Sequence, residues 1–320
     1  MKISLSQCLS IIRDAPRGYR GRLARRLLGS FPDLPQASTA EDCEFTSLVD
    51  YQKDYARLAT LLGREGKTPP AGEEEFLHSM IHRSPSYRGS IGIGDYFFLT
   101  AFVSILAPQR VIEIGTLTGF SAAIIAAALG RQHGQGSGAV VDTIDAFSQC
   151  IIDETRPTGF EIQTLIPDFA SMVRLHVPHD ATFVAELARP NELEIVFIDA
   201  DHRHPSVLRD VLSVAPYIRT GGWVILHDIQ LGTMGRQMKE RGESLPQATP
   251  FGAEWLFDRW PFRKFSGGQI GAIELPLRKD VIIPFALELM QAPFEVTGKS
   301  AQRIRRALYA SFADLLQNRD

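Results

Sequence analysis

The sequence predicts a doubly wound α/β fold built on a mostly parallel sheet. Five short segments rich in apolar and β-branched residues recur through the middle of the chain, separated by stretches with helical periodicity. The segments begin at Val111, Ala139, Arg174, Glu192 and Trp223. Acidic or histidine side chains follow the segments, where a parallel sheet of this kind binds ligands. The two observations together favour one ligand-binding edge on one sheet.

The first segment, VIEIGTLTGFS, combines a strand, a glycine turn and the start of a helix. Val111 to Ile114 is typical of a buried strand, and Gly115 and Gly119 bracket a tight turn. Ser121 is the predicted cap of the apolar helix AAIIAAAL. This combination therefore predicts a binding site for a small ligand at the turn. Its GxxxG spacing differs from the GxGxxG of dinucleotide sites, and no Gly-Lys-Ser/Thr follows.

Two further strands are predicted to end in a carboxylate. Asp145 ends AVVDTIDAF, a position suited to accepting both hydroxyl protons of a ribose diol. Between these strands we expect a helix over residues 158–173, interrupted at Pro167. Asp180 ends RLHVPHD, and capping a helix that begins near Thr182 is its alternative role.

The fourth and fifth strands carry the densest group of polar residues. Asp199 and His202 follow the fourth strand three positions apart, a spacing that shares one face of a helical turn. His227 and Asp228 end the fifth strand. Two carboxylates and an imidazole at neighbouring strand ends are able to converge on one divalent cation, which leaves His202 as a base.

Helical patterns flank the sheet on both sides. We divide the chain into an α-helical N-terminal region over 1–90, a sheet domain over 91–278 and C-terminal helices over 279–320. Asp95 is a predicted cap for a helix that runs to Leu106, and the Gly92–Asp95 segment either lines the ligand site or only caps that helix. Another helix is expected from Leu231, across the mouth of the site.

These motifs resemble those of class I S-adenosylmethionine-dependent methyltransferases. VIEIGTLTGFS is close to E-I-G-T-x-x-G-x-S of the catechol-like O-methyltransferases. FIDADH and GGWVILHDI resemble D-G-D-H…GG…HD, found in a branch that includes metal-dependent sugar O-methyltransferases of macrolide biosynthesis. FRKFSGGQIGAIEL is similar to the closing hairpin of that fold. The resemblance covers roughly residues 92–275 and implies a Rossmann-like methyltransferase fold.

The resemblance also implies roles for individual residues. S-adenosyl-L-methionine would be held by Glu113, Gly115, Thr116, Gly119, Ser121, Asp145 and Asp180. His202 would be the catalytic base, and a divalent cation, magnesium or another, would be bound by Asp199, His227 and Asp228. His227 departs from the pattern because it replaces a carboxylate. Imidazole is a poor ligand for magnesium, so the identity of the metal and its presence stay open.

The composition of the chain indicates which partners and which cellular compartment to expect. The net charge of −3 argues against a nucleic-acid partner, and no apolar run is long enough for a membrane span. Three scattered cysteines indicate a reducing compartment, so a cytoplasmic protein is expected. Homo-oligomerisation stays open. The predicted function is O-methylation of a small hydroxylated molecule such as a sugar, a phenol or another secondary metabolite. The alternatives are an NAD-type oxidoreductase and a methyltransferase-like protein without transfer activity.

Overall fold

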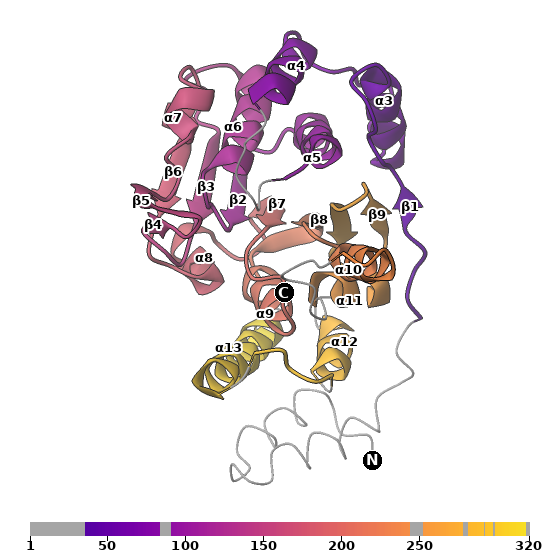
Figure 1. Cartoon of the computed structure of the whole chain (residues 1–320), viewed down its shortest axis with the longest axis vertical. Coiled ribbons are helices and arrows are strands. Elements are labelled where there is room, and N and C mark those ends of the chain that lie inside the picture. Colours follow the sequence, from indigo (N-terminus) through magenta and orange to yellow (C-terminus); the bar gives the residue numbers. More distant parts are fainter. Residues whose placement is uncertain are drawn as a thin grey trace.

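The fold is centred on one twisted sheet between two layers of helices (Figure 1). The computed structural model describes residues 36–83, 91–243, 252–277, 281–290, 292–296 and 298–317. The first 35 residues of the predicted α-helical N-terminal region lie outside these ranges. Within the described part of the chain the main sheet has eight strands in the order β1-β9-β10-β8-β7-β2-β3-β6.

The five predicted strands lie side by side and pair in parallel, and a hairpin closes the sheet beyond them. The strands of the sheet are β1 (Glu41–Asp42), β2 (Arg110–Ile114), β3 (Val140–Ile144), β6 (Val173–His176), β7 (Leu193–Ile198), β8 (Ile218–Leu226), β9 (Lys264–Ser266) and β10 (Gly271–Glu274). Parallel pairing joins β8 to β7, β7 to β2, β2 to β3 and β3 to β6. β10 is antiparallel to both β8 and β9. The predicted mostly parallel sheet with a closing hairpin is therefore confirmed.

Helices cover both faces of the sheet. The helices are α3 (Tyr51–Leu61), α4 (Glu73–Arg83), α5 (Ile93–Leu106), α6 (Phe120–His133), α7 (Ile162–Leu165), α8 (Val184–Leu187), α9 (Ser206–Val214), α10 (Leu231–Glu240), α11 (Gly252–Arg259), α12 (Ile282–Leu289) and α13 (Gly298–Gln317). In Figure 1 the helices from α3 to α7 lie above the sheet, whereas α8, α9 and α11 to α13 lie below it. No helix of the described residues is both long enough and apolar enough to cross a membrane.

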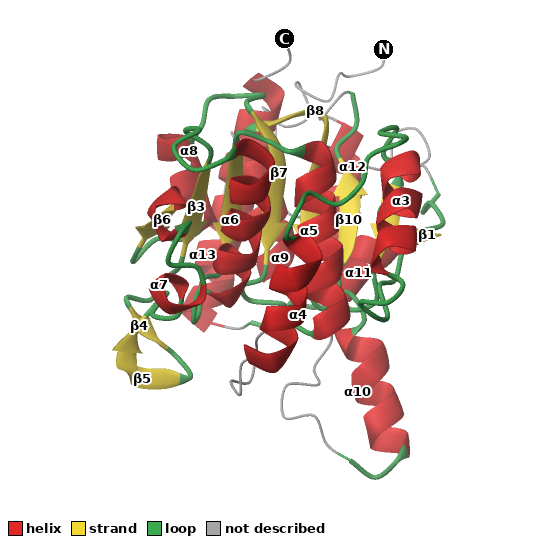
Figure 2. Ribbon diagram, turned by 90° about the horizontal axis from the view of Figure 1, so that it is seen from above, coloured by secondary structure: helices red, strands yellow, loops and turns green. Residues whose placement is uncertain are grey.

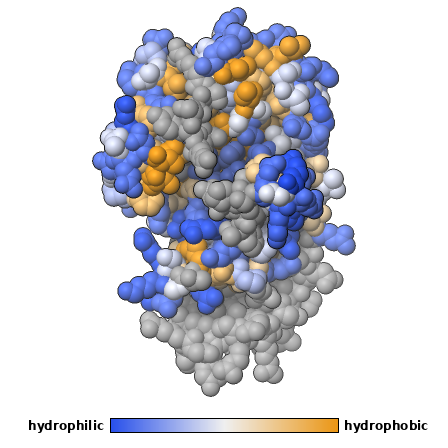
Figure 3. Space-filling view, viewed as in Figure 1, coloured by the Kyte–Doolittle hydropathy of each residue, from blue (hydrophilic) through white to orange (hydrophobic). Residues whose placement is uncertain are grey.

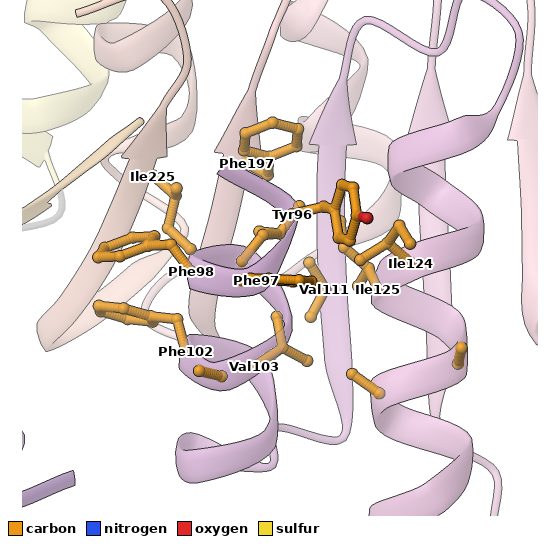
Figure 4. Packing of buried hydrophobic residues seen from close by; sticks show 14 of the residues in the cluster. Tyr96, Phe97, Phe98, Phe102, Val103, Val111, Ile124, Ile125, Phe197 and Ile225 are labelled. Carbon is orange, nitrogen blue, oxygen red and sulfur yellow. The ribbon is translucent and has the colours of Figure 1, made fainter. Parts of the chain in front are cut away.

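Each face of the sheet has its own hydrophobic core, because β2, β3 and β7 are buried on both sides. On one face, aromatic side chains of α5 and aliphatic side chains of α6 meet the strands (Figure 4). Phe97 and Phe102 of α5, Ile124 of α6 and Val111 of β2 are all fully buried there. This packing fixes the amino ends of α5 and α6 relative to the carboxyl ends of the strands, where the predicted site lies.

Three local predictions were wrong, each for an identifiable reason. The third strand ends at His176, before Pro178, whose missing N–H cannot continue a ladder. The helix expected over residues 158–173 is much shorter than predicted, because only α7 and a 3₁₀ turn at Ala170–Met172 form there; the predicted break at Pro167 does separate them. Ser121 lies inside α6, and the N-cap position belongs to Gly119.

Two segments project beyond the sheet on its carboxyl side (Figure 2). One is the hairpin of β4 (Gln149–Cys150) and β5 (Asp153–Pro157), which follows β3, and the other is α10, which follows β8. Phe147, Ile151 and Ile152 in and beside the hairpin are exposed. Figure 3 shows an apolar area on the same side of the molecule. The two projections flank the strand ends that carry the predicted site residues.

Candidate functional site

The predicted rim of polar residues exists in the folded chain. Gly115, Asp145, Asp199 and Asp228 follow β2, β3, β7 and β8, which are consecutive neighbours in the sheet. The backbone ladder continues past the strands, because the N–H of Gly115 donates to Ile144 at 2.8 Å and that of Asp199 donates to Ile114 at 2.8 Å. Strand order reverses between β2 and β7, and ligands of doubly wound sheets bind at such a reversal.

Glycine is required at both ends of the turn after β2. Gly115 has a φ of +99°, and a Cβ added there would lie 2.0 Å from the carbonyl oxygen of Asp199. Gly119 has a φ of +91°, and its added Cβ would lie 2.4 Å from the side chain of Ile162. The turn thus packs closely against the end of β7 and against α7. Its conformation brings the backbone of residues 116–118 towards the rim.

Asp145 links the end of β3 to that turn. One of its carboxylate oxygens accepts the N–H groups of Thr116 at 2.9 Å and Leu117 at 3.0 Å. The other oxygen accepts the N–H of Phe147 at 2.9 Å. The carboxylate remains partly exposed, so a ligand has access to its free lone pairs. Asp145 therefore both shapes the glycine turn and presents a fixed acceptor at the rim.

Glu113 lies beneath the rim and is fully buried. Burial raises its pKa to about 8, although hydrogen bonds from the hydroxyls of Ser121 and Thr143 act in the opposite direction. Near neutral pH its carboxyl group therefore carries a proton. Oε1 of Glu113 has no hydrogen-bond partner among the described residues. A buried polar atom of this kind is a candidate contact for a bound ligand. Ser121, predicted as a helix cap, instead supports Glu113.

His202 lies between two carboxylates at the open part of the rim. Its Nε2 is 3.1 Å from Asp228 and 3.6 Å from Asp199. The side chain of His202 is 24% exposed, compared with 10% for Asp199. His202 is thus the imidazole that a substrate is able to reach. Asp199 and Asp228 both face its Nε2.

His227 is enclosed by the same carboxylates and by one more. Nδ1 lies 3.2 Å from Asp199 and 3.6 Å from Asp228, and Nε2 lies 3.3 Å from Asp95 of α5. Burial alone would lower the pKa of His227, but the three acids raise it well above the usual value. Burial would raise the pKa of Asp199, but His227 and His202 hold it below its usual value. The acids around His227 therefore favour its protonated form.

This arrangement does not fit the predicted metal site. A metal ligand must offer a free nitrogen lone pair, whereas both ring nitrogens of His227 face carboxylate oxygens. Within the described ranges, no group of three or more acidic, histidine or cysteine side chains is arranged to hold a metal ion. Ligation of a metal by Asp199, His227 and Asp228 therefore stays a prediction without geometric support.

Asp180 caps a helical turn, which is the alternative role that the sequence analysis gave it. Its carboxylate accepts the N–H of Thr182 at 3.1 Å and caps the 3₁₀ turn Ala181–Phe183. Arg209 and Arg303 lie 3.9 and 3.8 Å from the same carboxylate. These interactions, with burial acting against them, lower its pKa. Contact of Asp180 with a cofactor stays a prediction.

Sequence reasoning missed Thr143 and left open whether the Gly92–Asp95 segment lines the site or only caps α5. Asp95 was expected to cap α5, and it does accept the N–H of Gly92 at 3.0 Å, but it also contacts His227. Thr143 of β3 donates its hydroxyl to Glu113 and lies 2.6 Å from the hydroxyl of Thr116. Neither contact has a local signal, because Asp95 and His227 are 132 positions apart.

Comparison with known proteins gives a match over the same part of the chain. Residues 112–229 match a family model described as "Methyltransferase domain". No curated protein matches the sequence. Among solved structures, similar ones include the O-methyltransferase TomG from Streptomyces achromogenes (16% identity, 70% of this chain, 98% of TomG, TM-score 0.42). Another is the O-methyltransferase from Bacillus cereus (19% identity, 69% of this chain, 99% of that chain, TM-score 0.39).

Both of these structures have TM-scores below 0.5. The family match is independent of them and spans β2 to the end of β8, including Glu113, Asp145, His202 and Asp228. Every predicted site residue thus lies within residues 112–229, the segment that matches the methyltransferase-domain model.

Proposed function

We propose that the protein is an S-adenosylmethionine-dependent O-methyltransferase that acts on a hydroxyl group of a small molecule such as a sugar or a phenol. The observation that carries the proposal is His202, an accessible imidazole held by Asp228 at 3.1 Å, on the rim that also contains the glycine turn and Asp145. A base beside a cofactor cradle is what methylation of a hydroxyl group requires.

The residues around the glycine turn fit this cofactor. S-adenosylmethionine, when bound, supplies a methyl group on a positively charged sulfur. Asp145 offers lone pairs to two ribose hydroxyls, and the exposed ring of Phe147 is suited to stacking on a purine. The unpartnered Oε1 of the protonated Glu113 lies under the same turn and is able to interact with a polar group of the ligand.

The chain's own part of the reaction is alignment and removal of a proton. Nε2 of His202 faces both acids, so Asp228 keeps a proton on Nε2 and leaves the lone pair of Nδ1 for the hydroxyl of the acceptor. As Nδ1 takes that proton, Asp228 and Asp199 stabilise the imidazolium that forms. General-base help of this type contributes roughly 10²–10⁴-fold to the rate.

Calorimetric titration with S-adenosylhomocysteine and, separately, with NAD tests the cofactor. Binding of S-adenosylhomocysteine alone supports the proposal, and binding of NAD alone favours the oxidoreductase. A second step incubates the protein with methyl-labelled cofactor and a panel of sugars, phenols and other hydroxylated compounds. Labelled product that is lost in His202→Ala supports O-methyl transfer. Cofactor binding without any product would instead favour a methyltransferase-like protein that lacks transfer activity.

A further inference from the structure

We propose that His227 is a built-in cation that takes the place of a divalent metal ion in this site, and that Asp95 is the positioning residue that holds it there. The role in turnover rests on the proposed function, whereas the exclusion of a metal ion does not. The proposal concerns a contact between α5 and the end of β8 that the sequence motifs do not contain.

The positive charge follows from the contacts of the ring. Nδ1 and Nε2 of His227 lie 3.2 and 3.3 Å from carboxylate oxygens of Asp199 and Asp95. A carboxylate only accepts hydrogen bonds, and a neutral imidazole has a single N–H. Both contacts are hydrogen bonds only when both ring nitrogens carry protons. With both acids ionised, the geometry therefore favours an imidazolium at this position.

The surroundings of the ring explain why a cation is needed. Asp95 comes from α5, Asp199 and His202 from the connection after β7, and Asp228 from the end of β8. Three carboxylates that converge from three elements repel one another, and such clusters ordinarily bind a cation from solution. His227 supplies that charge from within the chain. Its ring centroid is 6.3 Å from that of His202, so both rings share the same acids.

Asp95 holds the ring through a rigid part of the fold. The same carboxylate oxygen accepts the N–H of Gly92 at 3.0 Å and faces Nε2 of His227 at 3.3 Å. The backbone directly before Asp95 is closely packed as well, since a Cβ on Gly94 would lie 2.6 Å from the carbonyl oxygen of Phe45. Asp95 is only 8% exposed. The carboxylate of Asp95 therefore contacts Nε2 of His227, the nitrogen that a metal ion would otherwise bind.

Manganese binding to the full-length chain tests this exclusion without cofactor or acceptor. Electron paramagnetic resonance of free Mn²⁺ measures how much of the ion the protein takes up. The original chain should bind no stoichiometric Mn²⁺ at concentrations where His227→Asp binds one ion. The affinity of the variant should be at least about tenfold higher, because it exchanges a cation for a fourth nearby acid. His78→Asp, which makes the same replacement on the exposed surface of α4, should bind no better than the original chain.

Two results would overturn the proposal. One is stoichiometric Mn²⁺ binding by the original chain that disappears in Asp228→Asn. The other is a folded His227→Asp variant, judged by circular dichroism, that gains no affinity for Mn²⁺. If that variant does not fold, the measurement on the original chain decides alone. Mn²⁺ uptake does not depend on methyl transfer, so this outcome is separate from failure of the proposed function.

Asp95 has its own test once an acceptor is known. Asp95→Asn keeps an acceptor for the N–H of Gly92 but removes the charge that faces His227. We expect kcat to fall at least about tenfold with KM nearly unchanged, and the pH profile of kcat to shift. Asp95→Glu should restore part of kcat. An unchanged pH profile with a loss explained by a lower melting temperature would leave Asp95 a purely structural cap and contradict the positioning role.

Discussion

Nε2 of His202 lies 3.1 Å from a carboxylate oxygen of Asp228, although the two residues follow different strands of the sheet. β7 and β8 are parallel neighbours, with Ile198 opposite Leu226, so their carboxyl ends coincide. The pairing of the strands thereby assembles an acid and an imidazole that are 26 positions apart in the sequence. The same register places Asp199 beside both.

Replacing His202 by alanine should lower turnover and leave cofactor affinity nearly unchanged. Turnover is expected to fall roughly 10²–10⁴-fold because no other described imidazole is accessible between the two acids. Affinity for S-adenosylhomocysteine should change by less than about twofold, since His202 contacts neither Asp145 nor the glycine turn in the structure. Radiolabel transfer and calorimetry measure the two quantities, and His78→Ala serves as the control. Loss of cofactor affinity instead would contradict the role of base.

Asp145→Ala should weaken binding of the cofactor and also destabilise the glycine turn. The substitution removes the acceptor of the N–H groups of Thr116 and Leu117 as well as the charge at the rim. We expect affinity for S-adenosylhomocysteine to fall at least about tenfold, with a stability loss of about 1–3 kcal/mol for the buried donors left unpaired. Calorimetry and urea unfolding measure these effects. Asp153→Ala, in the exposed hairpin, is the control, and equal effects of both variants would refute the prediction.

Gly115→Ala should be much more destabilising than Gly134→Ala. Both glycines have positive φ, +99° and +82°, but an added Cβ meets the carbonyl oxygen of Asp199 at 2.0 Å only at Gly115. Nothing lies within 4 Å of a Cβ at Gly134. The backbone cost alone is about 1–2 kcal/mol, and the clash adds to it at Gly115. Urea unfolding followed by circular dichroism would show the difference, whereas matching losses would mean that the turn moves away freely.

Glu73 should make stability depend on pH. Burial raises its pKa from 4.5 to about 7, against hydrogen bonds from Ser104 and Tyr51 that lower it. The folded chain therefore keeps a proton that the unfolded chain loses above about pH 4.5, so stability falls as pH rises towards 7. Glu73→Gln should flatten this decline and be more stable at pH 8 by up to about 3 kcal/mol. Urea midpoints at several pH values measure it.

The control for this prediction is Glu74→Gln, one position along the same helix and not fully buried. It should leave the pH dependence of the original chain in place. A Glu73→Gln variant whose stability declines between pH 5 and 8 as steeply as that of the original chain would show that other groups, such as Glu113, dominate this range.

The sheet was predictable because the residues of each strand carry a clear strand signal in the local sequence. Ile195 to Ile198 is a continuous apolar run, and Val111 to Ile114 is apolar apart from Glu113. The polar residues after these strands fall at one edge of the sheet because the strands pair in parallel. Predictions failed where the outcome depended on proline or on distant partners. Pro178 ended β6 early, and the second role of Asp95 exists only because α5 packs next to the end of β8.

The two-residue strand β1 also escaped prediction, since the first 90 residues were expected to be helical. Glu41 and Asp42 pair in parallel with Phe265 and Ser266, and the N–H of Cys43 donates to Ser266 at 2.7 Å. Both residues of β1 are polar, so no alternation marks them. Their strand conformation comes from β9, which offers its free backbone groups, and that partner lies more than 200 positions away.

This pairing has a consequence for handling the protein. β9 would otherwise be the outermost strand, and unpaired edges of sheets invite association with other chains. Acidic Glu41 and Asp42 cover that edge and leave a short, charged border in its place. A shortened chain that starts at α3 would keep every rim residue yet lose this border, so it should aggregate more readily than the full-length protein.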